Sequence, residues 1–198
     1  MRLNSYYIET WGCQMNRHDS ARLEDLLREL GLTPAPSADL AHIVLLNTCS
    51  VREKPVHKLL SRIGELARKD PAPVVGVCGC VAEQLGAELL ERSGAVGFVL
   101  GPGRIERLAD ALAAHGAARR PVLTGFDDEP RAARGAPGPA GLARGSVTVI
   151  EGCDQYCTFC IVPYTRGREI SRPLAEVRAE AAALAAAGRL EIELLGQT

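Results

Sequence analysis

Strand-like runs and amphipathic stretches alternate along the first 112 residues of the chain. The runs that predict strands are residues 6–10, 43–46, 74–77 and 97–100. Between them, apolar residues recur every three or four positions, which is typical of helices with one buried face. The helices predicted in this way lie around residues 19–30, 59–66, 85–90 and 105–112. This alternation indicates βαβ units, so we predict an α/β fold with a parallel sheet and helices on both faces.

The ends of the first two helices are predicted from their flanking residues. Asp19 or Ser20 is the predicted N-cap of the first helix, and Gly31 its predicted end. Ser50 and Glu53 have the spacing of a capping box before the second helix. The buried face of the first helix is predicted to be Leu23, Leu26, Leu27 and Leu30.

The pattern is interrupted by a stretch of Ala, Gly, Pro and Arg and then resumes. Residues 127–145 show no apolar period, which predicts a linker without a packed core. Beyond it, strands at residues 146–150 and 190–195 flank an alanine-rich helix that follows Pro173. We therefore expect an N-terminal α/β domain over residues 1–126. The start of a larger parallel α/β (TIM-like) barrel is expected over residues 146–198.

Net charge, the lack of long apolar runs and the number of cysteines limit the kinds of protein that this chain can be. The net charge of −1 does not suggest a strongly basic nucleic-acid-binding protein. No secretory signal follows Met1 and no apolar run could span a bilayer, so we expect a cytoplasmic protein that does not contact a membrane. The seven cysteines are odd in number. In that compartment they are expected to be metal ligands or catalytic groups, not a set of disulfides.

Three of the cysteines follow predicted strands. Cys13, Cys49 and Cys80 each come just after the C-terminal end of a different strand. In a parallel sheet those ends share one edge, where open α/β sheets place their ligands. The sequence therefore predicts a three-cysteine site built from distant parts of the chain.

A second set of three cysteines lies on one short loop. Cys153, Cys157 and Cys160 form a C-x3-C-x2-C motif directly after a predicted strand. Three unliganded thiols there would be prone to oxidation, and a zinc site would need a fourth ligand that does not follow nearby. A 4Fe-4S cluster with one iron left open fits the spacing best, and that iron could bind a substrate or cofactor.

The loop and its neighbours resemble the radical S-adenosylmethionine (SAM) methylthiotransferase family. The motifs that carry the resemblance are Thr10–Asn16 (TWGCQMN), Asn47–Arg52 (NTCSVR), Gly79–Gln84 (GCVAEQ), Val149–Cys160 around the loop, and Ile161–Gly167 (IVPYTRG). The resemblance covers nearly all of the chain outside the linker. It implies that residues 146–198 begin a radical SAM barrel.

The resemblance also implies cofactors and ligands. The loop cysteines would hold one 4Fe-4S cluster, whose open iron binds SAM and generates a radical. Cys13, Cys49 and Cys80 would hold an auxiliary 4Fe-4S cluster that carries the sulfur to be transferred. Two clusters need six thiols, so one is spare: Cys78 adjoins a buried strand, where cysteine acts as a small hydrophobe, and the family pattern also selects Cys80.

Within the family, the first motif favours one substrate. A branch acting on a ribosomal-protein aspartate tends to carry Pro-Lys-Asn where this chain has Gln14, Met15 and Asn16, and a branch acting on threonylcarbamoyl-adenosine in tRNA tends to lack Trp11. The resemblance thus implies methylthiolation of C2 in an N(6)-isopentenyl-type adenosine beside the anticodon of tRNA. The alternatives are those two branches, a non-catalytic iron–sulfur electron-transfer module, and a zinc-binding module.

Some roles stay open on the sequence alone. Phe159 could lie beside the SAM adenine or pack the loop onto the barrel. Asn16 and Asn47 could hydrogen-bond cluster sulfurs or shape turns, and Arg166 and Arg168 could meet SAM or RNA phosphate or remain solvated.

The family's partners would be the tRNA anticodon stem-loop, SAM and a flavodoxin- or ferredoxin-like reductant. We expect a monomer. We also expect the 198 residues to be a fragment of a longer protein that is inactive alone, since the chain ends after a second barrel strand.

Overall fold

The computed structural model describes residues 3–50, 55–126 and 143–197. The chain divides into two compact units, Met1–Gly125 and Phe126–Thr198. Each unit has its own secondary structure and is described by itself.

The first unit is built on a parallel sheet of six strands in the order β2-β1-β3-β4-β5-β6. The strands are β1 (Ser5–Trp11), β2 (Thr33–Pro34), β3 (Ile43–Thr48), β4 (Val74–Gly79), β5 (Val96–Leu100) and β6 (Val122–Leu123). Every pairing in this sheet is parallel. The predicted parallel α/β sheet is thereby confirmed.

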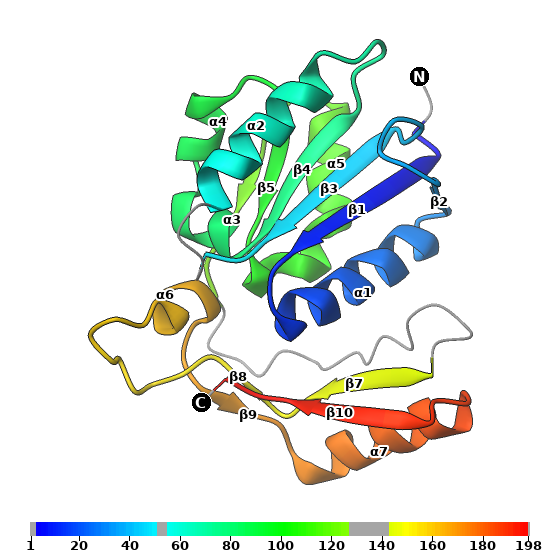
Figure 1. Ribbon diagram of the computed structural model, residues 1–198, viewed down its shortest axis with the longest axis vertical. Coiled ribbons are helices and arrows are strands. Elements are labelled where there is room, and N and C mark those ends of the chain that lie inside the picture. The colour runs from blue at the N-terminus through cyan, green and yellow to red at the C-terminus, as the bar shows by residue number, and fades with distance from the viewer. Residues whose placement is uncertain (1–2, 51–54, 127–142, 198) are drawn as a thin grey trace. The chain divides into compact units, whose positions relative to one another are not determined.

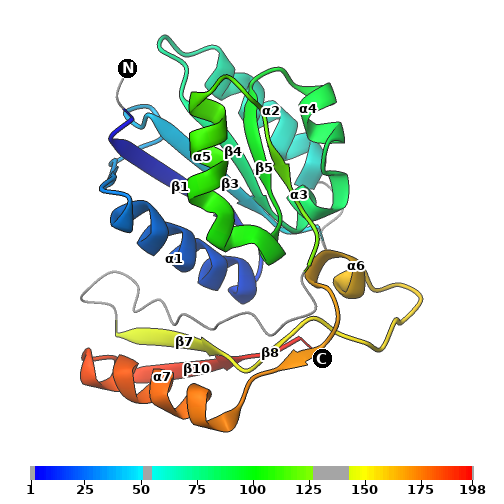
Figure 2. The same cartoon turned by 180° about the vertical axis from the view of Figure 1, so that it is seen from behind.

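Helices cover both faces of this sheet (Figures 1 and 2). One face carries α1 (Gln14–Glu29), the 3-10 helix η1 (Pro102–Arg107) and α5 (Leu108–Gly116). The other carries α2 (Pro55–Ala67), α3 (Cys80–Leu85) and α4 (Glu88–Arg92). Among the described residues, no helix is both long enough and apolar enough to cross a bilayer.

Strand β3 shows why the sheet is covered on both sides. All six of its residues are buried. Ile43 and Leu45 pack with the α1 and α5 side, whereas Val44 and Leu46 pack with the α2 side. Because successive side chains point to opposite faces, a strand buried on both faces needs the continuous apolar run that the sequence shows.

Helix α1 begins earlier than predicted. Its N-cap is Cys13, not Asp19 or Ser20. The Asn16 side-chain oxygen accepts a hydrogen bond from the Cys13 backbone N–H at 3.4 Å, which satisfies a donor at the helix start. Asp19 is buried inside the helix, and the Ser20 hydroxyl lies 2.7 Å from that of Thr10. Both polar residues thus serve tertiary packing rather than capping.

The predicted leucine face of α1 is confirmed only in part. Leu23 and Leu27 are fully buried and Leu26 is partly buried. Leu30 lies just past the helix and is 47% exposed. Gly31 follows with φ of 78°, as predicted for the end of the helix.

Two further details differ from the prediction, and one prediction is not tested. The helix expected around residues 85–90 is two short helices, α3 and α4, because the chain turns at Gly86 with φ of 50°. The edge strands β2 and β6 were not predicted, since each has only two residues. Glu53 of the predicted capping box lies outside the described residues.

The second unit contains a strand–helix–strand element. Strand β7 (Arg144–Thr148) pairs in parallel with β10 (Glu191–Leu195), and α7 (Leu174–Ala186) connects them. Between β7 and α7, the antiparallel pair β8 (Ile150–Glu151) and β9 (Ile170–Ser171) brackets the short helix α6 (Val162–Arg166).

The predicted strand at residues 146–150 is therefore wrong in its bounds. It is divided between β7 and β8, and β7 takes in Arg144 and Gly145, which were predicted to be linker. Residues 127–142 of that linker lie outside the described part. The described residues form a two-stranded parallel sheet here, so the TIM-like barrel stays a prediction.

Leu27 and Leu30 provide a test of the observed end of α1. We expect Leu27→Ala to lower the free energy of unfolding by about 2–5 kcal/mol, because it leaves a cavity in the core. Leu30→Ala should change it by less than about 0.5 kcal/mol, as surface changes do. Urea unfolding followed by circular dichroism measures both. Equal losses in the two variants would contradict the helix end described above.

Candidate functional site

Three cysteines follow three neighbouring strands of the first sheet. Strands β1, β3 and β4 lie side by side and end level with one another, with Trp11 paired to Thr48 and Thr48 paired to Gly79. Cys13, Cys49 and Cys80 come one or two residues after these ends. The predicted convergence of the three segments at the C-terminal edge of the sheet is confirmed.

The three thiols differ in exposure and are not gathered into a finished metal site. Cys49 and Cys80 are buried, whereas Cys13 is exposed, and all three carry a thiol, not a disulfide. Among residues 3–50, 55–126 and 143–197, no group of three His, Cys, Asp or Glu side chains lies close enough to hold a metal ion. The backbone brings the segments together, but their roles as ligands remain a prediction.

The donor set at this edge fits an iron–sulfur cluster. The side chains of Cys13, Cys49 and Cys80 are soft ligands when ionised, and iron–sulfur clusters are held by such thiolates. Two of the three thiols are shielded from water, an environment that tunes such clusters.

The neighbouring Cys78 is placed differently. It lies inside β4, is fully buried, and packs in the core cluster beneath α1 and α5. Burial, and to a lesser extent the nearby charge of Asp19, raises the pKa of the Cys78 thiol far above its usual range. A thiol that does not ionise is a poor metal ligand, which agrees with its predicted role as a small core hydrophobe.

The C-x3-C-x2-C loop lies between β8 and α6, contains one internal turn, and is tied at its start to the chain that follows α6. The Cys153 backbone N–H donates to the Gly167 carbonyl at 3.2 Å, and the Cys160 N–H donates to the Cys157 carbonyl at 2.9 Å. The Asp154 carboxylate accepts a bond from the Glu169 backbone N–H at 3.1 Å. The loop therefore closes onto the chain that follows α6.

Gly152 lets the two sides of the loop approach. Its φ is 74°, and a Cβ there would lie 2.0 Å from the Arg168 carbonyl oxygen and 2.5 Å from that of Gly167. Its N–H donates to the Gln197 side-chain oxygen at 2.6 Å. Gln197 was missed by sequence reasoning, because no local pattern links two residues so far apart in the chain.

The loop carries exposed aromatic side chains. The Tyr156 and Tyr164 rings meet edge to face with centroids 6.1 Å apart. Phe159 is 92% exposed, so within the described residues it does not pack the loop onto the fold. Cys153 is buried, Cys160 half-buried and Cys157 exposed.

The two arginines near the loop and the histidines take varied positions. Arg166 is buried within α6, and Arg168 lies on the surface 3.8 Å from the Asp154 carboxylate. His42 lies 2.7 Å from the Ser5 hydroxyl. No histidine of the described residues belongs to a metal-binding group.

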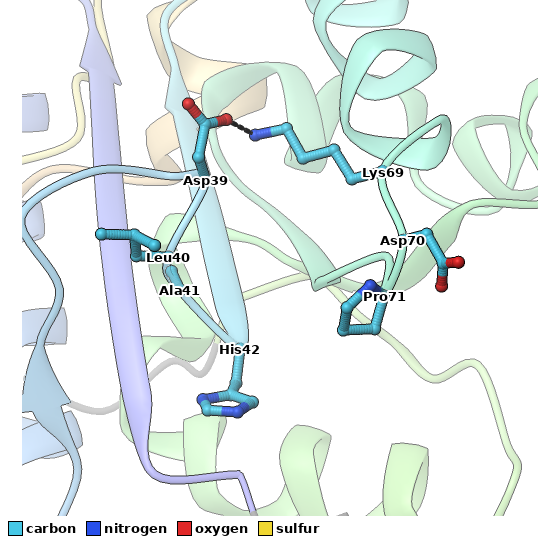
Figure 3. Close-up of a pocket in the computed structure, with 7 residues that line it drawn as sticks. All are labelled: Asp39, Leu40, Ala41, His42, Lys69, Asp70 and Pro71. Atoms are coloured by element: carbon cyan, nitrogen blue, oxygen red, sulfur yellow. Dashed lines mark hydrogen bonds and ion pairs between the residues drawn. The ribbon is translucent and has the colours of Figure 1, made fainter.

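A surface pocket lies at the opposite edge of the first sheet (Figure 3). It has a volume of about 400 Å³ and is formed by the segments that lead into β3 and β4: Asp39, Leu40, Ala41, His42, Lys69, Asp70 and Pro71. Asp39 and Lys69 form an ion pair across it, and the hydrogen bond from Lys69 lowers the pKa of the Asp39 carboxyl. Because the cysteines follow the other ends of these strands, this pocket is not part of their site.

Much of the chain matches known proteins. Residues 5–101 match the model of the uncharacterized protein family UPF0004. A tRNA-2-methylthio-N(6)-dimethylallyladenosine synthase of Sorangium cellulosum is 48% identical over 98% of this chain and 41% of its own length. Synthases of the same name from Erwinia tasmaniensis and Thiobacillus denitrificans are each 43% identical, over 96% and 98% of this chain and 41% and 45% of their own lengths.

The similarity to these synthases extends over nearly all of this chain. The chain spans about two fifths of the length of the curated relatives it matches.

Two glycines with similar backbone angles test how the C-x3-C-x2-C loop is held. Gly152 and Gly188 have φ of 74° and 86°, but a Cβ at Gly188 would meet nothing within 4 Å. We expect Gly188→Ala to cost about 1–2 kcal/mol of stability from the left-handed backbone alone. Gly152→Ala should cost more and should expose residues 153–160 to limited proteolysis. Equal effects of the two substitutions would contradict the close approach at Gly152.

Proposed function

We propose that this chain is the cluster-binding part of a tRNA methylthiotransferase. The enzyme would add a methylthio group to C2 of an N(6)-isopentenyl-type adenosine beside the anticodon. The observation that carries the proposal is the pair of three-cysteine sets, one at three adjacent strand ends and one on a single loop. They occur in a chain that is 43–48% identical to synthases named for this product.

The proposed division of the chain follows the two sets. Residues 1–126 would be the methylthiotransferase N-terminal domain with the auxiliary cluster, residues 127–145 the linker, and residues 146–198 the start of the radical SAM barrel. The parallel pairing of β7 with β10 across helix α7 supports the barrel, since that connection is its repeating unit.

The loop cysteines Cys153, Cys157 and Cys160 would hold one 4Fe-4S cluster, and Cys13, Cys49 and Cys80 the auxiliary one. When bound, the two clusters and SAM supply radical removal of hydrogen from the adenine C2 and the sulfur and methyl group that take its place. The chain's own part is to present three thiolates at each place and leave one position of each cluster open.

The start of the loop is anchored in a way that suits this task. Gly152 allows the close crossing, the Cys153 N–H donates to the Gly167 carbonyl, and the Glu169 N–H donates to the Asp154 carboxylate. A ligand that is already held in place loses little freedom when it binds. Phe159 is exposed next to Cys160 and is proposed to lie beside the SAM adenine, where an aromatic ring can stack.

The other proposed partners follow from this chemistry. They are the tRNA anticodon stem-loop, SAM and a flavodoxin- or ferredoxin-like reductant that supplies electrons to the clusters. We propose a monomeric enzyme of the cytoplasm, where tRNA is modified. Action on a ribosomal-protein aspartate or on threonylcarbamoyl-adenosine is not favoured, because the matched relatives carry the dimethylallyladenosine name.

Iron counting tests the two ligand sets. After anaerobic reconstitution of the full-length protein, we expect about eight irons per chain, as two 4Fe-4S clusters require. Alanine at Cys13, Cys49 and Cys80 together should leave about four, and so should alanine at the three loop cysteines. Cys78→Ala is the matched control and should retain about eight. A loss of about four irons in Cys78→Ala, or none in the first triple variant, would refute the assignment.

The substrate is tested with tRNA nucleosides from a strain that lacks the gene. Mass spectrometry should show loss of the 2-methylthio form and accumulation of the isopentenyl-type adenosine that precedes it. A gene copy with Cys78→Ala should restore the product, whereas one with Cys80→Ala should not. Loss of methylthiolation on threonylcarbamoyl-adenosine instead, or on a ribosomal protein, would identify one of the other branches.

A further inference from the structure

Two buried asparagines lie where the three strand-end cysteine segments meet. Asn16 is in the first turn of α1, three residues after Cys13. Asn47 is in β3, two residues before Cys49. Both side chains are fully buried.

The two side chains are joined by a directional set of hydrogen bonds. Asn47 Nδ2 donates to the backbone carbonyl oxygen of Asn16 at 2.8 Å and to the Ser20 hydroxyl at 2.9 Å. Its Oδ1 therefore faces Asn16 Nδ2, which donates to it at 3.0 Å. Asn16 Oδ1 then accepts from the Cys13 N–H and lies 3.4 Å from the Cys13 sulfur. Each amide is usable in one orientation only, because donors and acceptors must alternate along this set.

The third segment packs against the same pair. Gly79 directly precedes Cys80 and has φ of 86°. A Cβ at Gly79 would lie 2.3 Å from Asn47 Oδ1 and 3.0 Å from Asn16 Nδ2. The amide pair thus contacts all three cysteine segments. Asn16 is hydrogen-bonded to Cys13, Asn47 belongs to the same strand-end segment as Cys49, and Gly79, next to Cys80, packs closely against both amides.

We propose that Asn16 and Asn47 are positioning residues that hold the Cys13, Cys49 and Cys80 segments together for the auxiliary cluster. This inference rests on the proposed function, in which these cysteines bind that cluster. The sequence left open whether these asparagines contact cluster sulfur or shape turns. The structure favours a role shared between segments, because the amide of Asn47 is fully used by Asn16 and Ser20.

The first measurement needs no iron. Amide hydrogen exchange of the apo full-length protein should be at least tenfold faster in Asn47→Ala and Asn16→Ala at residues 12–16, 48–50 and 79–82. Exchange in the middle of β3 and β4 should change little. Asn4→Ala is the matched control, since Asn4 is exposed at the start of the sheet. Unchanged exchange at the three segments, or equal acceleration throughout the sheet, would overturn the proposal.

The second measurement tests whether substitution of Asn16 or Asn47 weakens iron binding by Cys13, Cys49 and Cys80. In a background with alanine at Cys153, Cys157 and Cys160, a chelator should remove iron about 10–100-fold faster from the Asn variants, because loss of the groups that orient metal ligands lowers metal affinity by about that factor. In the complementary background, which lacks the strand-end cysteines, the removal rate should not change. Equal chelation rates in the first background would overturn the proposal.

The two measurements separate this proposal from the proposed function. If the first background binds no iron even with both asparagines present, the auxiliary cluster is wrong and the cluster-positioning role falls with it. In that case local acceleration of exchange would still show that the amides join the three segments. If iron binds and the Asn variants behave as the parent does, only the asparagine role is wrong.

Discussion

The parallel pairing of β1, β3 and β4 is the constraint on which the rest of the first unit depends. Their register makes Trp11, Thr48 and Gly79 level with one another, so the three strands end at one line. A slip of one residue would move every side chain of a strand to the other face of the sheet. The same pairing that buries Ile43 and Leu46 therefore fixes where the following cysteines begin.

Burial of both faces of the sheet also distinguishes Cys78, which lies in β4, from Cys80, which follows that strand. Cys78 is within the strand and points into the core, whereas Cys80 follows Gly79 and starts α3. The distinction depends on a single glycine whose backbone angle redirects the chain at the sheet edge. It is a physical reason for assigning Cys80 and not Cys78 to the proposed cluster.

The two cysteine sets are built in contrasting ways. Cys153, Cys157 and Cys160 are close in sequence, and their loop is held by backbone bonds and one glycine crossing. Cys13, Cys49 and Cys80 are far apart in sequence and depend on tertiary contacts, among which the Asn16 and Asn47 amides are central. Buried amides of this kind are costly unless every donor and acceptor is used. The hydrogen bonds of this pair form only when the Cys13 and Cys49 segments are both in place.

Local patterns in the sequence were enough to predict the alternation of strands and helices, the parallel sheet, and the presence of thiols at three strand ends. These follow from local periodicity, because a strand buried on both faces must be continuously apolar. The tertiary structure alone decided the start of α1 at Cys13, the bond from Gln197 to Gly152, and the joining of Asn16 to Asn47. Such features depend on contacts between residues distant in the chain, and a polar side chain that looks like a helix cap, as Asp19 does, can instead be buried by those contacts.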